Sequence, residues 1–382
     1  MTNRPVPESV CPVTEGNSFE IITSGLRKRE LLLKDLEEAR SFIHIEYFRF
    51  GSDKAGREVR EILMKKAAEG VEVRFLNNNW SGLIRIPRSF FTKMIKAGVE
   101  EIRFTHIRQG LRKWLFRINH QQHRKIVVID GRVAYTGGMN LNDNYFYRWR
   151  DTHLRITGPA VACYSASFLE SWRDSGGRVS RPPEYYLPAC EAEADAPFRD
   201  KALQVVEGSP ESRPSVMLQG FCRILQDARK SVRIQTPYFV PPRCLLDAIK
   251  DAARRGVDVR MMLPKNVDTP FLAPLNRSYY TQCLKAGVRI FERGGSFIHS
   301  KTFTADDAIA VIGSSNLDER SFRLNYEVDT VIYDEETALR MRESFEKDQS
   351  EAQEILLPAW TAGRNWYHRL LPAFLKIFRR QF

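Results

Sequence analysis

The stretches HRKIVVIDGRVAYTGGMN (123–140) and HSKTFTADDAIAVIGSSN (299–316) carry the same five residue types at the same spacing. Both satisfy the pattern HxKxxxxDxxxxxxGxxN, and a chance match would not recur at corresponding places in two halves of one chain. Residues two apart on a strand face the same way, so the histidine and the lysine converge on one point. The following glycines let the backbone turn back toward that point. Each stretch therefore predicts one half of a functional site.

The repeat extends outward from these motifs. LLLKDLEEARSFIHIEYF (31–48) and QGFCRILQDARKSVRIQTPYF (219–239) both read as an amphipathic helix running into a buried strand, with Ser41 matching Ser231. In the segments that follow, a helix ends at Gly70 or Gly256 before a Val-rich strand. Helices and strands alternate throughout, which predicts an α/β fold. We expect two tandem α-β-α domains, each a mostly parallel sheet flanked by helices, with the active site at their interface.

Length and composition support two domains, because 382 residues exceed one typical domain and 43% of them are hydrophobic. A segment rich in Gly, Pro and acidic residues separates the two copies and reads as a linker. The predicted parts are a flexible N-terminal segment (1–17), a first domain with the first motif (18–172), the linker (173–201), a second domain with the second motif (202–350) and an amphipathic basic C-terminal segment (351–382).

The net charge of +12 points to an anionic partner: nucleic acid, an anionic membrane surface or a phosphorylated substrate. No run of about 18 apolar residues occurs, so no membrane-spanning helix is expected, and the polar, Pro-rich N-terminus does not read as a signal peptide. The six cysteines are scattered without CxxC spacing, which favours neither disulfides nor a zinc site. Membrane attachment is therefore expected to be peripheral.

Two half-sites together would supply two imidazoles, two ammonium groups and two amides around one pocket, a set suited to a phosphodiester. One of His123 and His299 would attack phosphorus to form a phosphohistidine, and the other, protonated, would protonate the leaving alcohol. Lys125 and Lys301 would stabilise the negative charge of the transition state. Asn140 and Asn316, which complete the two motifs, would add amide donors. This chemistry needs neither a metal nor another cofactor.

Carboxylates occur at equal offsets from the two histidines. Asp151 lies 28 residues after His123, and Glu327 lies 28 residues after His299. We expect each to accept the second ring N–H of a histidine, which fixes the tautomer and favours the cation. Which carboxylate serves which histidine is left open. The motif residues Asp130 and Asp306 lie at the far end of a short strand and are interpreted as turn-forming or structural.

Other residues are weaker candidates. His44, in an apolar strand, reads equally as a core residue or a pocket wall. The substrate-binding candidates share a place near a motif or at the end of a first strand, and are Glu46, Tyr238, Ser314 and His120. Aromatic residues beside basic clusters suggest membrane contact, at Trp114, Phe116, Trp366 and Phe378. The alternatives are a basic surface loop at 105–119 and a terminal helix that closes its own domain.

The duplicated motif resembles the phospholipase D superfamily, and NHQQHRKIVVIDG, WRDTHLRITGPAV and IGSSNLDERSFRLNYEVD look like bacterial cardiolipin synthases. The resemblance covers about residues 18–350. It implies transfer of a phosphatidyl group from one phosphatidylglycerol to another, with release of glycerol, and it makes His123 the nucleophile and His299 the acid. Many such synthases begin with two membrane spans, so we expect a short form without them, peripheral on the cytoplasmic side of the inner membrane. Gly138 stands where many superfamily members have serine.

Two competing functions share these features. A phosphodiesterase would hand the phosphoenzyme to water and act on phospholipid or nucleic acid, but the aromatic residues beside the basic clusters favour lipid over nucleic acid. A non-catalytic protein that binds anionic membranes is disfavoured, because both motifs are intact. The acceptor, the second phospholipid and the oligomeric state are not determined by these residues.

Overall fold

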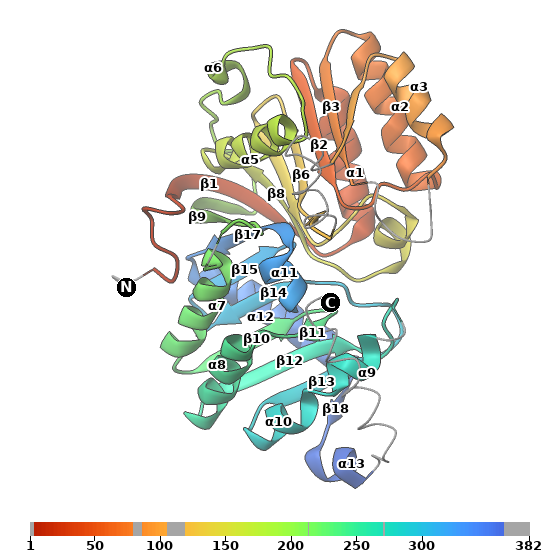
Figure 1. Ribbon diagram of the computed structural model, residues 1–382. Helices are drawn as coiled ribbons and strands as arrows, with labels where there is room; N and C mark the ends of the chain where they lie inside the picture. The colour runs from red at the N-terminus through yellow and green to blue at the C-terminus, as the bar shows by residue number, and fades with distance from the viewer. Residues whose placement is uncertain (1–3, 79–85, 105–118, 213, 270–271, 363–382) are drawn as a thin grey trace. The chain divides into compact units, whose positions relative to one another are not determined.

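The computed structural model describes residues 4–78, 86–104, 119–212, 214–269 and 272–362 (Figure 1). It divides into two compact units, a first unit of Val13–Val205 and a second unit of Met1–Pro12 with Val206–Phe382. The remaining segments include Trp114, Phe116, Trp366 and Phe378, so the predicted membrane contacts lie outside the described residues.

The first unit is built on one mixed sheet, in the order β9-β1-β8-β7-β6-β2-β3-β4. Its strands are β1 (Val13–Ile22), β2 (Phe42–Tyr47), β3 (Glu72–Asn77), β4 (Glu100–Arg103), β5 (Gln121–Gln122), β6 (Lys125–Ile129), β7 (Val133–Gly137), β8 (His153–Thr157) and β9 (Phe198–Gly208). Its helices are α1 (Gly25–Glu38), α2 (Lys54–Ala68), α3 (Arg88–Lys96), the π-helix η2 (Asn144–Arg148), α5 (Ala160–Asp174) and α6 (Pro183–Tyr186).

Alternate residues of β2 face the two helical layers. Ile43 and Ile45 lie in the core formed with α1, α2 and α3. On the other face, the ring of His44 stacks on Phe168 of α5 at 4.4 Å, and Phe42 contacts Tyr186 of α6. Helices cover this strand on both faces, so all six residues of FIHIEY are buried, including the polar His44 and Glu46.

The second unit repeats this plan, with the sheet order β18-β13-β12-β10-β14-β15-β17 and a separate pair β11-β16. Its strands are β10 (Ser231–Gln235), β11 (Phe239–Val240), β12 (Asp258–Pro264), β13 (Arg289–Arg293), β14 (Thr302–Ala305), β15 (Ile309–Gly313), β16 (Leu317–Asp318), β17 (Asn325–Ile332) and β18 (Ala352–Ile355). Its helices are α7 (Val216–Asp227), α8 (Arg243–Arg254), α9 (Leu272–Arg277), α10 (Tyr280–Lys285), α11 (Glu319–Arg323), α12 (Glu335–Ser350) and α13 (Leu357–Ala362).

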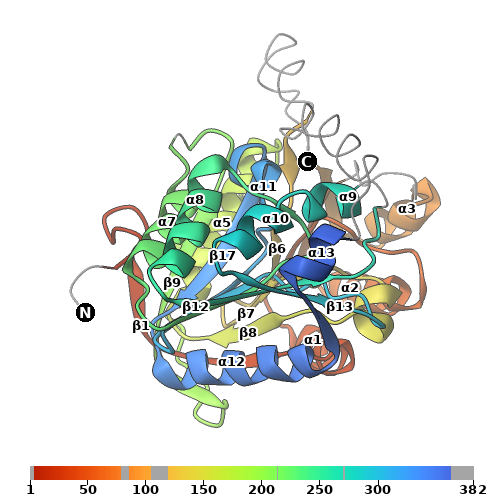
Figure 2. The same cartoon turned by 90° about the horizontal axis from the view of Figure 1, so that it is seen from below.

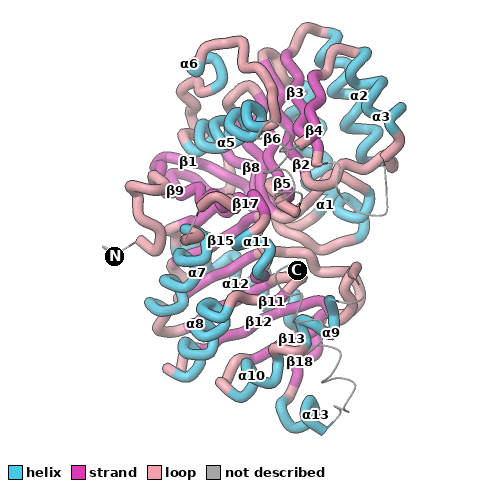
Figure 3. The backbone as a smooth tube through the Cα atoms, viewed as in Figure 1, coloured by secondary structure: helices cyan, strands magenta, loops and turns pink. Residues whose placement is uncertain are grey.

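The view in Figure 2 shows α12 along one side of strands β12 and β13, with α7, α8 and α10 along the other. Val232 and Ile234 of β10 lie in the core with α7 and α8, whereas Gln235 donates to the Asp348 carboxylate of α12 at 2.9 Å. Both units therefore have the predicted α-β-α layers, coloured by secondary structure in Figure 3.

The prediction of a mostly parallel sheet is wrong in one respect. In the main sheet of each unit, three neighbouring strands are parallel (β2-β3-β4 and β10-β12-β13), and the strands that carry the motif are antiparallel to them. The cause is local: Asp130 and Gly131 have positive φ and close a tight turn between β6 and β7, which forces an antiparallel hairpin. The start of β6 consequently lies beside the carboxyl end of β2, with Lys125 opposite Tyr47.

The segments predicted to flank and link the two domains contain buried and paired residues. Val6 and Cys11, in the predicted flexible segment, are buried in the core of the second unit, and β1 begins at Val13. In the predicted linker, Tyr186 is buried and Glu193 pairs with Arg155 of the first unit. The predicted C-terminal segment begins with strand β18, which pairs with β13. Among the described residues, no helix is long and apolar enough to cross a membrane.

The predicted helix ends are confirmed. Gly70 and Gly256 follow α2 and α8 with φ of 88° and 90°, a conformation that glycine adopts without strain. The serines Ser24 and Ser215 cap the amino ends of α1 and α7, accepting hydrogen bonds from the amides of Arg27 and Leu218. The two halves thus use the same local devices at corresponding places.

Candidate active site

Asp130 and Asp306 bind backbone amides at the start of β2 and β10. Asp130 accepts hydrogen bonds from the amides of Arg40, Ser41 and Phe42, at 2.8, 2.7 and 2.9 Å. Asp306 accepts hydrogen bonds from the amides of Arg229, Lys230 and Ser231, at 2.7, 2.7 and 2.9 Å. Ser41 therefore corresponds to Lys230, which shifts the match with Ser231 by one residue. The geometry gives both aspartates an architectural position, away from the histidines.

We expect Asp306→Ala to lower the free energy of unfolding by about 2–4 kcal/mol, because three amide donors lose an ionised acceptor and alanine tolerates the φ of 54° poorly. Thermal unfolding followed by circular dichroism measures the effect. Asp227→Ala, which removes a carboxylate from an exposed i,i+4 pair on α7, is the control and should change the midpoint little. Equal midpoints for the two variants would contradict this role of Asp306.

Each histidine is held next to its lysine through the backbone. The Lys125 ammonium donates to the carbonyl oxygen of His123 at 2.6 Å. The Lys301 ammonium donates to the carbonyl oxygen of His299 at 2.6 Å, and its Nζ lies 2.8 Å from Nδ1 and 3.1 Å from Nε2 of the same ring. All four residues are buried. His123 and His299 precede β6 and β14 and do not lie within them. The bond from each lysine ammonium to the histidine carbonyl therefore helps to hold the lysine side chain beside its histidine.

Two aromatic rings border the pairs. Phe48 meets the ring of His123 edge-on at 4.8 Å, and the Lys125 ammonium lies 5.6 Å from the Phe48 centroid. In the second unit, Phe297 lies 5.9 Å from the His299 ring. Apolar neighbours reduce the access of water, so the charges of the lysines act over a lower effective dielectric.

The two motif asparagines have different partners. Asn140 accepts a hydrogen bond from the amide of Arg49 at 3.1 Å and donates to the hydroxyl of Tyr145 at 2.8 Å. The backbone N–H of Asn316 donates to Ser321 Oγ at 3.1 Å. No donor among the described residues reaches the buried side-chain oxygen of Asn316. Asn140 is thus held by its own unit, whereas Asn316 keeps unused hydrogen-bonding capacity.

The offset carboxylates Asp151 and Glu327 are both fully buried. Glu327 accepts hydrogen bonds from Ser314 Oγ at 2.6 Å and from Asn325 Nδ2 at 3.1 Å. Asp151 accepts one from the amide of Thr152 at 2.7 Å. Asp151 lies directly against Gly138 at the end of the first motif, and Glu327 lies against Ser314 at the end of the second.

The exchange of serine for glycine at position 138 has a steric cause. A Cβ added to Gly138 would lie 2.1 Å from Oδ1 of Asp151, closer than any real contact. The second unit pairs the longer Glu327 with Ser314, whose hydroxyl donates to it. The combinations Gly138 with Asp151 and Ser314 with Glu327 therefore solve the same packing problem in two ways.

We expect Gly138→Ser to lower the free energy of unfolding by about 3 kcal/mol through this overlap, and Gly138→Ser with Asp151→Glu to recover most of the loss by copying the second unit. A double-mutant cycle on thermal unfolding measures the coupling. If the two substitutions simply added, the steric account would be wrong.

The weaker substrate-binding candidates and His44 lie in different surroundings. Glu46 is buried near the end of β2, but its counterpart in the sheet register is Gln235 and not Tyr238, since Glu46 faces Ile126 and Gln235 faces Thr302. The Tyr238 hydroxyl donates to the Asp268 carboxylate. The half-buried His120 precedes β5, and the ring of His44 is enclosed in the first unit's core, where burial lowers its pKa to about 4.

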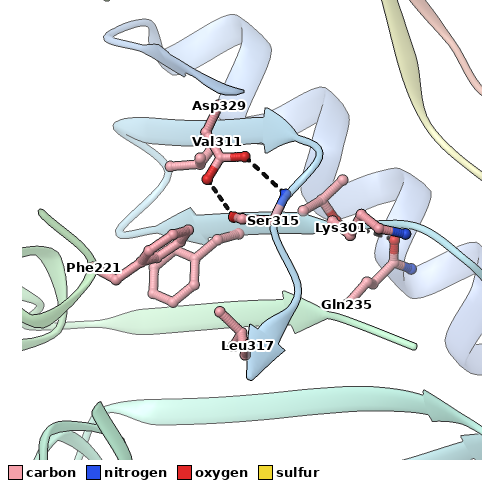
Figure 4. Close-up of a pocket in the computed structure, with 9 residues that line it drawn as sticks. Phe221, Gln235, Lys301, Val311, Ser315, Leu317 and Asp329 are labelled. Atoms are coloured by element: carbon pink, nitrogen blue, oxygen red, sulfur yellow. Dashed lines mark hydrogen bonds between the residues drawn. The ribbon is translucent and has the colours of Figure 1, made fainter. Parts of the chain in front are cut away.

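Gln235 lies beside Lys301 at a cavity of about 10 Å³, the size of one water molecule (Figure 4). Thr302 Oγ1 donates to the Gln235 side-chain oxygen at 3.1 Å, and Ser315 donates to Asp329 through both its amide and its hydroxyl. The lysine of the second motif therefore lies at the same small cavity as several buried polar groups, which sequence patterns did not reveal.

Burial raises the pKa of Asp329 to about 6; the hydrogen bonds from Ser315 oppose this rise, and the charge of Glu327 adds to it. A carboxyl group with a raised pKa in the folded state contributes stability below its unfolded pKa and loses it as pH rises. The free energy of unfolding should therefore fall by roughly 3 kcal/mol between about pH 4 and pH 6 on account of this group.

We expect Asp329→Asn, which cannot ionise, to gain stability relative to the unmodified chain as pH rises from 4 to 7. Unfolding midpoints at four pH values measure this gain. A stability difference that stays constant over this range would show that Asp329 does not titrate there.

Two further buried residues of the first unit escaped sequence analysis, Lys28 and His153. Lys28 stands on the buried stripe of α1 with Leu32, Asp35 and Leu36, and a charge in an apolar stripe was the signal that could have identified it. His153 had no such signal, because its position depends on the pairing of β7 with β8. Among the described residues, no group of three His, Cys, Asp or Glu is placed to hold a metal ion.

The comparisons with known proteins agree with this geometry. The family model described as cardiolipin synthase, PLD-like domain, matches residues 32–172 and 221–349. The chain is 35% identical over 375 residues to the major cardiolipin synthase ClsA of Bacillus subtilis, covering 95% of this chain and 76% of that one. It is 34% identical over 372 residues to a cardiolipin synthase of Halalkalibacterium halodurans, covering 96% and 72%.

Among solved structures, the fold resembles the phosphatidylserine synthase of Haemophilus influenzae, with a TM-score of 0.73, 15% identity and coverage of 96% and 97%. At that identity the likeness concerns the fold alone. The family match spans both motifs, and each half of the chain carries a buried His–Lys pair with a buried carboxylate. The chain therefore belongs to the cardiolipin synthase family of phospholipase D-like proteins.

Proposed function

We propose that this phosphatidyltransferase joins two phosphatidylglycerol molecules into cardiolipin and glycerol through a phosphohistidine on His123. The observation that carries the proposal is the duplicated buried pair, in which each lysine ammonium is bound to the carbonyl oxygen of its histidine at 2.6 Å. In this proposal the two half-sites serve one phosphodiester.

In the first step, neutral His123 attacks phosphorus while the bond from phosphorus to the glycerol oxygen breaks, and protonated His299 gives its proton to the departing glycerol. In the second step, His299 takes a proton from the hydroxyl of a second phosphatidylglycerol. That oxygen attacks phosphorus, and the bond from phosphorus to His123 breaks. The proton and the free histidine are both regenerated, so the cycle closes.

The remaining residues of each half-site stabilise charge and orient the rings. Lys125 and Lys301 offset the charge on the non-bridging oxygens, and the unused oxygen of Asn316 accepts a hydrogen bond from the substrate. Asp151 and Glu327 accept ring N–H groups from the histidines. Peripheral binding to the anionic cytoplasmic face of the membrane, favoured by the net charge of +12, brings the enzyme to its substrate.

The purified chain, incubated with phosphatidylglycerol vesicles and a chelator, tests the proposal. Mass spectrometry should detect cardiolipin and glycerol, and a denaturing quench at mildly alkaline pH, where the P–N bond of a phosphohistidine survives, should trap phosphatidyl label on the protein. Phosphatidic acid in place of cardiolipin would mean that water is the acceptor. Product formation without any trapped label would contradict the covalent intermediate.

A further inference from the structure

The two half-sites are not electrically equivalent. The strand pairings place Gly137 opposite His153 and Gly313 opposite Asp329, so His153 and Asp329 hold equivalent positions. The two helices that precede the first strands end at the C-cap residues Ala39 and Ala228. Counted back from these caps, Lys28 of α1 corresponds to Met217 of α7. Lys28 and His153 of the first unit are therefore replaced by Met217 and Asp329 in the second.

Lys28 reaches the first motif from α1. Its ammonium donates to the carbonyl oxygen of Met139, between Gly138 and Asn140, at 2.9 Å and lies 5.0 Å from the Tyr47 ring. The titratable or charged groups that face it are Asp151, Lys125, His153 and Tyr47. Burial lowers the pKa of Lys28 well below its usual value, the charge of Asp151 opposes this shift, and Lys125 adds to it. Lys28 is thus a buried basic group at the end of the first motif, where Asp151 also lies against Gly138.

His153 adds no negative charge at its position. Its ring is fully buried, and neither ring nitrogen has a hydrogen-bond partner among the described residues. Burial lowers its pKa well below the usual value, and the charges of Lys28 and Lys125 lower it further. It therefore stays neutral under conditions in which a carboxylate would be ionised.

At the same two positions, the second half-site has no basic residue and has an additional acidic one. Met217 is an apolar core residue, and two fully buried carboxylic acids, Glu327 and Asp329, lie on β17. The charge of Glu327 raises the pKa of Asp329, and it also acts on the buried Asp318. Two basic residues of this half-site act against these acids. The Lys301 ammonium, 2.8 Å from Nδ1 of His299, opposes a proton on that ring, and burial lowers the pKa of Arg320 while the charges of Asp318 and Glu327 oppose that shift.

We propose that Lys28 and His153 are positioning residues that make a proton bind less tightly at His123 than at His299, and so assign attack to the first histidine and proton donation to the second. The inference rests on the proposed function. In this proposal Asp151 serves His123 and Glu327 serves His299. The basic group of Lys28 then offsets the carboxylate that favours an imidazolium on His123, whereas Glu327 and Asp329 favour one on His299. The asymmetry prepares one neutral and one charged histidine at the same pH.

The test is a pH titration of the full chain labelled with ¹⁵N-histidine, followed by NMR. The chain contains only seven histidines, and substitutions of His123 and His299 assign their resonances. The unmodified protein should show His123 titrating below His299. Lys28→Met, which copies the second unit, should raise the His123 midpoint by about one pH unit and leave that of His299 in place.

His153→Asp copies Asp329 and should shift the His123 midpoint in the same direction, which provides a second route if Lys28→Met folds poorly. Lys66→Met is the matched control, because it removes a buried lysine that pairs with Glu69 on α2, and it should move neither histidine. An unchanged His123 midpoint in the folded variants, or a His123 midpoint above that of His299 in the unmodified chain, would overturn the inference.

The titration needs no turnover, so it is independent of the assay for the proposed function. Absence of trapped phosphatidyl label with the expected titration shifts would count against the phosphohistidine mechanism alone. Trapped label with no shifts would count against the role of Lys28 and His153 alone.

Discussion

His123→Asn should reduce cardiolipin formation by at least about 10⁴-fold, the scale of loss when a nucleophile is removed from a catalytic unit. The asparagine fills similar space but cannot form the covalent intermediate, so the alkaline denaturing quench should trap no phosphatidyl label on this variant. The rate of cardiolipin formation and the labelled protein are measured on the same vesicles.

His299→Asn is the informative companion variant. It removes the proposed proton donor and not the nucleophile, so overall transfer should also fall strongly, but a substrate with an acidic leaving group needs little protonation. Such a substrate should still label the His299→Asn protein and should fail to label the His123→Asn protein. The reverse pattern would exchange the two roles, and label on both variants would contradict a single nucleophile. Unchanged thermal midpoints establish that both proteins are folded.

The second large effect is expected for Lys301→Met. The ammonium of Lys301 touches the carbonyl oxygen and both ring nitrogens of His299, within 2.6 to 3.1 Å, and methionine keeps most of its length without the charge. Loss of one preorganised cation from a phosphoryl-transfer site costs about 10²–10³-fold in kcat. KM should change little, because the charge that Lys301 offsets develops in the transition state.

Lys125→Met should behave in the same way in the first unit, since Lys125 makes the corresponding contact with His123. Lys66→Met again serves as the control, because it removes a buried lysine from α2 and should leave kcat unchanged. If Lys301→Met retained full kcat, or if the loss appeared only in KM, the lysine would contribute to substrate binding and not to catalysis.

Much of the architecture follows from local patterns. The two HxKxxxxD stretches lie at equivalent places in the two units, and the apolar run Ile126–Ile129 forms the buried strand that the pattern indicates. The glycines that end α2 and α8 act as expected. These features depend on neighbours in the chain, so the periodicity of a strand or a helix is sufficient to predict them.

The errors arose where strands pair. The match of Ser41 with Ser231 is one residue off, since the hydrogen bonds to Asp130 and Asp306 define the register. Tyr238 was predicted to end a first strand, as Glu46 does, but β10 ends at Gln235, which is the residue in register with Glu46. A shift of one residue along a strand moves every side chain to the opposite face, and the amino-acid pattern of a strand buried on both faces does not distinguish the two registers.

The chain's residues alone specify the duplicated His–Lys motif, the α/β repeat and a set of groups suited to a phosphodiester, because these depend on residue type and on spacing along a strand. The charge balance of the half-sites was decided by tertiary structure. Lys28 and Asp151 are far apart in the sequence, and only the packing of α1 against the first motif sets their interaction. Electrostatic energies depend on distance and on burial, and both are properties of the folded chain.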